Sequence, residues 1–187
     1  MILENACEFK EYLPGVFDEL GFNGSFEVID NAIHLNLIPI DNQETPTKEQ
    51  ILEKIKETMI KRKKQELEKE INTICKEKII NGFKSEVLGS LHAYDLTLED
   101  QANLQALVIA SIDSIFRCAE VINGVAGFKT YKKHTKAQLL KLSQEALKFK
   151  SDLILFYGRE KERLNAINSL EALEKFSIKE YLTYEEV

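Results

Sequence analysis

Apolar and polar side chains alternate along two neighbouring segments in the first quarter of the chain. Residues 25–29 (SFEVI) alternate, and residues 32–40 (AIHLNLIPI) alternate again after Asp30-Asn31. A period of two is typical of a strand with one buried face, and the Asp-Asn pair suits a two-residue turn. We therefore predict a β-hairpin in which His34 points away from the packed face. The residues expected on that packed face are Ile33, Leu35 and Leu37.

Helical spacing of apolar residues predicts the elements on either side of this hairpin. The spacing over residues 1–13 indicates a short helix that Pro14-Gly15 would stop. After a polar linker, Thr47 and Gln50 form a capping box that begins a long helix reaching Asn81. Its two apolar stripes are separated by a polar stretch, residues 61–66. Whether the first stripe packs on its own strands or on a partner helix is left open.

A corner and a second helix are predicted after the long helix. Gly82 suits the left-handed position that closes a helix, and Gly89-Ser90 suits the turn of a short hairpin over residues 83–96. Thr97 is followed by two acids, which is the signature of a helix start. The apolar face that follows predicts one core helix from Thr97 to the glycine-rich end at residues 123–127.

Two further helices are predicted near the end of the chain. Residues 128–132 (FKTYK) fit a short strand or an extended loop. A second capping box, Thr135 to Gln138, starts a helix that continues to about residue 167, with Gly158 as a weak point. Asn168-Ser169 then starts a last short helix, and we expect the acidic tail to be extended.

Together these elements predict an α+β protein. Residues 1–60 form an N-terminal module of helix, hairpin and the start of the long helix. Residues 61–187 form a mainly helical domain with a small hairpin, so the long helix connects the two.

Composition narrows the class of protein. The chain has 187 residues, of which 44% are hydrophobic and 30% charged, which is typical of a globular chain with a real core. The net charge of −6 disfavours a nucleic-acid partner. The three cysteines are widely spaced, which predicts free thiols in a reducing compartment. We expect no signal peptide and no membrane span.

No residue pattern predicts an active site. His92 and Asp95 are close in sequence, but no nucleophile carries a recognised motif, and the glycines fit no nucleotide-binding loop. The cysteines and histidines do not cluster as zinc ligands do. We therefore expect no catalytic, cofactor-binding or metal-binding residues, with a hydrolase around His92 as the least favoured alternative. Gln101 and Asn103 are unusually polar for an apolar helix, so they bind either the backbone of the corner or a partner protein.

A basic run, Lys61 to Lys64, gives the main alternative function. Such a run can bind nucleic acid, and it would make the protein a small regulatory nucleic-acid binder. The run is flanked by glutamates at helical pairing distance, which favours a solvated stretch of helix instead.

Five short segments in order resemble an uncharacterised domain family of tailed phages and prophages. The resemblance covers residues 64–176. Its pieces are I-C-x-x-x-I-x-N-G-F (Ile74 to Phe83), L-G-S-x-H-x-Y (Leu88 to Tyr94), D-Q-x-N-L (Asp100 to Leu104), H-T-x-A-Q-L (His134 to Leu139) and I-N-S-L-E-A-L (Ile167 to Leu173).

Proteins with this domain are encoded among tail genes, and some are similar to tail-fibre assembly proteins. The resemblance implies a tail component or an assembly chaperone that binds other tail proteins or itself as a homo-oligomer. It implies no catalytic residues. The protein would then be found in the host bacterial cytoplasm during assembly, or in the virion tail.

Overall fold

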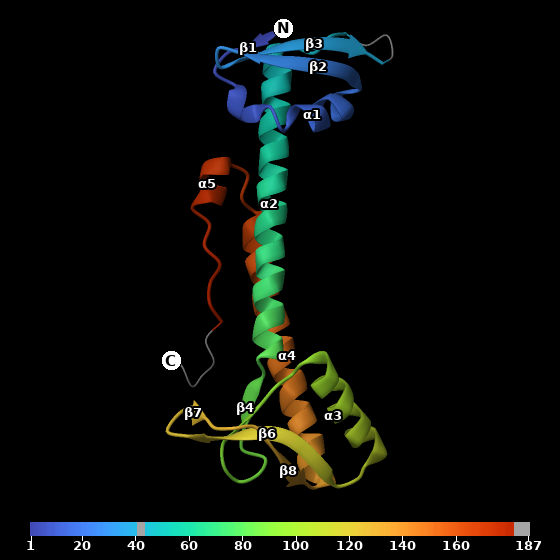
Figure 1. Cartoon of the computed structure of the whole chain (residues 1–187), viewed down its shortest axis with the longest axis vertical. Helices are drawn as coiled ribbons and strands as arrows, with labels where there is room; N and C mark the ends of the chain where they lie inside the picture. The colour runs from blue at the N-terminus through green and yellow to red at the C-terminus, as the bar shows by residue number, and fades with distance from the viewer. Residues whose placement is uncertain (41–43, 182–187) are drawn as a thin grey trace. The chain divides into compact units, whose positions relative to one another are not determined.

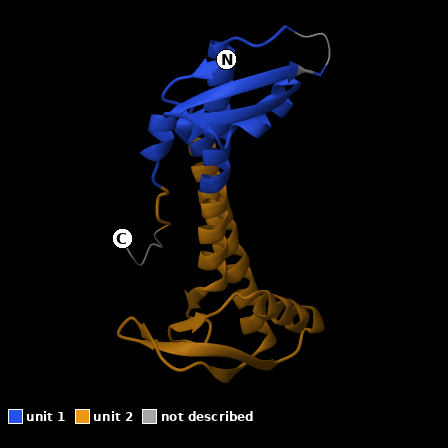
Figure 2. Cartoon of the chain, turned by 45° about the horizontal axis from the view of Figure 1, so that its top comes forward, with its two compact units in different colours: residues 1–67, 164–177 blue, residues 68–163, 178–187 orange. Residues whose placement is uncertain are grey.

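The computed structural model describes residues 1–40 and 44–181, and these residues divide into two compact units (Figure 2). Unit 1 comprises residues 1–67 and 164–177, and unit 2 comprises residues 68–163 and 178–187. The chain therefore leaves unit 1, builds unit 2, and returns. The fold is α+β, as the sequence predicts, and each unit has its own sheet (Figure 1).

Unit 1 packs helices on one face of a three-stranded antiparallel sheet, whose strand order is β1-β3-β2. Its elements are β1 (Ile2–Leu3), a 3₁₀ turn (Cys7–Phe9), α1 (Leu13–Leu20), β2 (Phe22–Ile29), β3 (Ala32–Pro39), the start of α2 (Lys48–Ile80) and α5 (Leu170–Glu174). The predicted hairpin is confirmed. Asp30 and Asn31 both have positive φ, at 47° and 65°, as a primed two-residue turn requires.

The first apolar stripe of α2 packs on the strands and helix of its own unit. Ile51 and Ile55 are fully buried with Ile33 and Leu35 of β3 and with Phe17 of α1. This packing answers the question that the sequence left open. His34 lies on the opposite face of β3 from Ile33 and Leu35, as predicted, because side chains alternate along a strand.

The predicted helix over residues 1–13 is wrong. Residues 2–3 form a strand that pairs with β3, and the helix of this region runs from Leu13 to Leu20. Pro14 lies in the first turn of α1, where its missing N–H would have no helical partner in any case. The proline therefore begins the helix that it was expected to end.

Both ends of α2 form as predicted. The Gln50 side chain accepts the Thr47 N–H at 2.8 Å, and the Thr47 hydroxyl accepts the Gln50 N–H at 3.3 Å. At the other end Gly82 has a φ of +81°. The helix reaches 33 residues without a break.

Unit 2 is built around a five-stranded antiparallel sheet with order β4-β5-β6-β7, in which β8 also pairs with β6. Its elements are the end of α2, β4 (Phe83–Ser85), β5 (His92–Tyr94), α3 (Leu98–Ala110), β6 (Ser114–Ile122), β7 (Val125–Ala126), β8 (Thr130–His134) and α4 (Lys136–Asn165). The predicted corner hairpin is confirmed as β4 and β5. The segment predicted as a short strand or a loop is largely β8.

The predicted helix from Thr97 to residue 122 is correct only in its first half. The chain leaves the helix at Ser111, whose φ is +53°, and residues 114–122 form the central strand β6. Phe116 and Cys118 are buried on that strand while Arg117 between them is exposed. A strand period therefore replaces the helical period after Ser111.

The later helices agree with the sequence. The Thr135–Gln138 capping box starts α4, which is continuous through Gly158, and Ser169 caps α5. Within unit 2 the second half of α2 lies beside the second half of α4 (Figures 1 and 2). Lys161 Nζ of α4 is 3.8 Å from Glu68 Oε1 of α2. The tail is predicted to be extended. Residues 176–181 have no regular secondary structure, and residues 182–187 lie outside the described residues.

Residues 178–181 have no regular secondary structure and are bound to α2 and α4. The buried carboxylate of Glu160 accepts the backbone N–H of Lys179 at 3.0 Å and the guanidinium of Arg163. Burial raises the pKa of Glu160, but these two hydrogen bonds outweigh it and hold the pKa below its usual value. Tyr181 packs edge-on against Phe156 with ring centroids 5.3 Å apart.

Candidate functional site

Helix α3 is apolar but largely unburied. Of its 13 residues only Leu104 is buried in the structure. Leu98 and Ile109 are 77% and 76% exposed, and they are the ends of an exposed stripe. The stripe is formed by Leu98, Ala102, Gln105 and Ile109, spaced as one helix face. A helix of this composition is normally covered by another element.

Helix α4 carries a second exposed apolar stripe. Leu140, Leu147 and Ile154 recur every seven residues, and their side chains are 49%, 66% and 51% exposed. Gln144 and Ser151, also exposed, lie between them on the same face. This is the spacing of a seam between two packed helices. The adjacent face of α4, roughly 100° around the helix, is buried in the core of unit 2 through Leu139, Leu142 and Ala146.

The two stripes are neighbours on unit 2. A groove of about 330 Å³ between α3 and α4 is lined by residues of both helices, among them Leu104, Gln105, Ala146 and Leu147. We call the stripes together the α3/α4 face: Leu98, Ala102, Gln105, Ile109, Leu140, Leu147 and Ile154. It is the candidate functional site, because it combines exposed apolar area with a groove.

Gln101 and Asn103, the residues predicted as partner contacts or backbone ligands, have different surroundings. The Gln101 amide donates to the carbonyl of Leu96 at 2.8 Å and its oxygen accepts from Lys150 Nζ at 2.7 Å. Gln101 therefore ties α3 to the corner and to α4 at one wall of the groove. Asn103 is exposed on another side of α3, where it lines a second hollow of about 420 Å³ with Tyr131.

Arg117, which also lines that second hollow, belongs to an ion cluster centred on Asp95. The carboxylate of Asp95 accepts hydrogen bonds from Arg117 Nη2 at 3.1 Å and from Lys129 Nζ at 2.5 Å. Asp95 thus pairs with cations of other strands and loops and does not orient His92, although the two residues are close in sequence.

Behind the α3/α4 face the core contains a set of buried polar groups that the sequence did not predict as a cluster. Tyr94 donates its hydroxyl to His134 Nε2 at 3.0 Å. That direction follows because His134 Nδ1 donates to the Lys132 carbonyl at 2.9 Å, which leaves Nε2 as the acceptor. Burial lowers the pKa of His134 and raises the pKa of Tyr94, so both groups are neutral at pH 7.

His92 is 3% exposed and is held in the same way. Its Nδ1 donates to the carbonyl of Ser90 at 2.8 Å, and its Nε2 has no hydrogen-bond partner within the described part of the chain. Close by on β4, the hydroxyl of Ser85 donates to the carboxylate of Glu145 on α4 at 2.5 Å. The Ser85 oxygen in turn accepts the N–H of Val87 at 3.2 Å.

These polar groups tie the sheet to α4. A serine nucleophile is activated by a base, usually a histidine that an acid orients. Here the partner of Ser85 is Glu145, and the partners of His92 and His134 are backbone carbonyls and Tyr94. Neither the α3/α4 groove nor the second hollow is lined by Ser85, His92 or His134. The hydrolase alternative therefore has no aligned nucleophile, base and acid among these contacts.

The basic run lies in unit 1 and its side chains bind elements of the same unit. Arg62 lies over the Tyr12 ring at 4.7 Å, and Lys64 Nζ donates to the Asn165 carbonyl at 2.8 Å. Lys61 and Lys63 pair with Glu19 and Glu66 at 3.6 and 3.7 Å. The run is thus engaged in intramolecular contacts.

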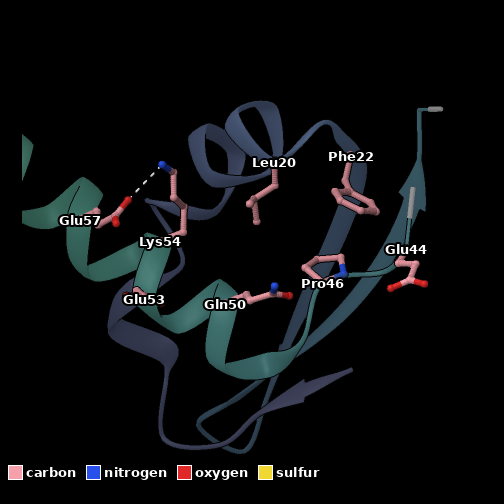
Figure 3. A pocket seen from close by; sticks show the side chains of 8 residues that line it. All are labelled: Leu20, Phe22, Glu44, Pro46, Gln50, Glu53, Lys54 and Glu57. Carbon is pink, nitrogen blue, oxygen red and sulfur yellow. Dashed lines mark hydrogen bonds and ion pairs between the residues drawn. The ribbon is translucent and has the colours of Figure 1, made fainter. Parts of the chain in front are cut away.

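Unit 1 has a hollow of its own, of about 420 Å³, shown in Figure 3. Leu20, Phe22 and Pro46 supply its apolar side, and α2 supplies Gln50, Glu53, Lys54 and Glu57. Lys54 Nζ is bound to Glu57 at 3.0 Å and to Glu19 at 2.9 Å. The hydrogen bond from Lys54 lowers the pKa of Glu19, so this pair is ionised at pH 7. One ion pair, Lys54 with Glu57, therefore lies within the lining of this hollow.

The described residues contain no group of three or more His, Cys, Asp or Glu side chains placed to hold a metal ion. None of the helices in residues 1–40 and 44–181 is both long and apolar enough to cross a membrane. Comparison with protein-family models, with curated proteins and with solved structures finds no match for this chain.

Proposed function

We propose that this chain is a non-enzymatic, tail-associated protein of a phage or prophage that acts through protein–protein contacts. It serves as a structural component of the tail or as a chaperone of tail-fibre assembly. The contact surface is the α3/α4 face of unit 2.

The observation that supports a contact function is the exposure of α3. Leu98 and Ile109 leave large apolar side chains in water, and Leu147 and Ile154 do the same on α4. Burying such side chains against a partner stabilises a complex by roughly 25 cal/mol per Å² of apolar area, before the costs of association. The assignment to tails rests on the five sequence segments that resemble the phage domain family.

The test uses the gene products encoded beside this chain in its own genome. Each neighbouring tail protein is purified, and its binding to this chain is measured by calorimetry with the parent and with Leu147→Glu. We expect one tail protein to bind the parent, and we expect Leu147→Glu to weaken that binding. Phe128→Glu is the matched control, because Phe128 is 97% exposed and lies outside the α3/α4 face. A chain that binds none of these proteins, and whose deletion leaves tails complete in electron micrographs, would refute the proposal.

A further inference from the structure

The α3/α4 face has the geometry of one half of a four-helix bundle. Its two helices are antiparallel: Lys150 of α4 reaches Gln101 near the start of α3, whereas the carboxylate of Asp113, just after α3, accepts the N–H of Lys136 at the start of α4. Residues near 101 are therefore level with residues near 150. Four-helix bundles bury stripes of this kind between two such pairs.

We propose that the other half of the bundle is a second copy of this chain. This inference rests on the proposed function for the choice of surface, and it names the partner that covers it. A two-fold axis parallel to the helices places α3 of one copy across α4 of the other, and the two copies make the same contact twice.

The apolar positions match in this arrangement. Level with one another across the axis are Leu98 and Ile154, and then Gln105 and Leu147, while Ile109 and Leu140 are offset along the helices by about 4.5 Å. At 1.5 Å per residue, Leu98 and Ile109 are about 16 Å apart and Leu140 and Ile154 about 21 Å apart, so the stripes have similar lengths. The smaller side chains Ala102 and Ser151 lie between the large ones, which allows the two layers to interdigitate.

The charges on α3 and α4 favour this arrangement over a dimer whose two-fold axis is perpendicular to the helices. The charged residues of α3 are two acids, Glu99 and Asp100, whereas residues 136–154 of α4 carry four lysines and two acids. Asp100 caps its own helix, and Lys148 pairs with Asp152 of its own chain at 2.5 Å. Crossing α3 with α4 of the second copy brings Glu99 toward Lys148, because both lie on the outer edge of their stripes. An axis perpendicular to the helices would instead place α3 on α3 and α4 on α4, so that the lysines of the two copies face one another. Such like-charge contact across an interface is costly.

Sedimentation of the full chain tests the dimer. We expect a species of twice the 21.5 kDa chain mass at high protein concentration. Leu147→Glu should raise the dissociation constant by about tenfold or more, because it buries a carboxylate without a partner. Glu99→Lys should also weaken the dimer, and weaken it less in high salt. The controls are Phe128→Glu and Glu86→Lys, whose exposed side chains lie outside the face. Thermal unfolding of each variant confirms that it is folded.

A crosslinking experiment tests the pairing itself. The variant with Leu98→Cys and Ile154→Cys should give a covalent dimer under mild oxidation, seen on a non-reducing gel. The variant with Ile109→Cys and Ile154→Cys places its thiols at opposite ends of the stripes and should not, because a disulfide needs Cα atoms within about 7 Å. The native cysteines are the same in both variants, so they do not distinguish them.

The outcomes separate this inference from the proposed function. A parent chain that sediments as a monomer at all concentrations, or a dimer unaffected by Leu147→Glu, overturns the second copy as the partner. A monomer that binds a tail protein through the α3/α4 face overturns only this inference. A dimer that crosslinks as expected but has no tail partner overturns only the assignment to tails.

Discussion

Gly82 allows a sharp test of the corner between α2 and β4, because the chain contains a matched control. Gly82 and Gly89 have nearly the same backbone conformation, with φ of +81° and +87°. A Cβ added at Gly82 would lie 1.8 Å from the carbonyl oxygen of Tyr94, whereas a Cβ at Gly89 would meet nothing within 4 Å. Only the space around the two residues differs.

The magnitudes follow from this difference. An alanine in the left-handed region costs roughly 1–2 kcal/mol, and both variants pay that cost. At Gly82 the backbone of β5 must also move away by more than an ångström, which breaks the register of Phe83 with Tyr94. Overpacking of this kind costs typically about 1–3 kcal/mol more. We therefore expect losses of roughly 2–5 kcal/mol for Gly82→Ala and roughly 1–2 kcal/mol for Gly89→Ala.

Urea unfolding followed by far-UV circular dichroism measures both losses. The chain contains no tryptophan, so the helical signal is the better probe. Equal losses for the two variants would refute the reasoning, because they would show that backbone conformation alone accounts for the cost and that the approach to Tyr94 does not matter.

Three further predictions use the same unfolding measurement. Thr97→Ala removes the acceptor of the Asp100 N–H and should cost about 1 kcal/mol, while Thr97→Ser should be close to the parent; equal losses would contradict the cap. Ser111→Gly relieves a φ of +53° and should raise stability by up to about 1 kcal/mol, and no gain would mean that Ser111 is unstrained. The folded pKa of His134 lies below its ordinary 6.5, so on acidification the unfolded chain takes up a proton before the folded chain does. Stability should therefore fall as pH decreases from about 6.5 toward the folded pKa, and by less in His134→Gln; an unchanged pH profile in that variant would exclude this contribution.

Local signals predicted the starts and ends of most elements. The capping boxes at Thr47 and Thr135, the left-handed Gly82 and the Asp30-Asn31 turn each depend on a few adjacent residues, so the sequence carries them directly. The misjudged helix end at Ser111 lacks such a signal. A serine occupies the left-handed position there, with no glycine or proline nearby, and the apolar residues after it fit both helical and strand spacing.

The candidate site was missed for the same reason. Residues 98–122 as one helix would have a single broad apolar face, which indicates a core. In the structure Phe116 and Cys118 belong to strand β6, so α3 is shorter than predicted. Leu98 and Ile109 of this shorter helix are exposed. The spacing of these residues is visible in the sequence, but which face of a helix is covered depends on tertiary packing. The cluster of Tyr94 and His134 is likewise a product of strand pairing, since the two residues are 40 positions apart.

The return of the chain has a consequence for how the protein folds as it is synthesised. Unit 1 includes residues 164–177, where Leu173 is buried, and unit 2 includes residues 178–181, where Glu180 binds Lys78 at a separation of 102 residues. Helices α2 and α4 can form early from local contacts, but closing loops of this length is slow. Unit 1 is complete only after residues 68–163 of unit 2 have been made, and unit 2 is complete only after residues 164–177 of unit 1 have been made. A cut between Leu67 and Glu68 therefore leaves residues 1–67 without residues 164–177 of their own unit, whereas the other fragment contains all of unit 2.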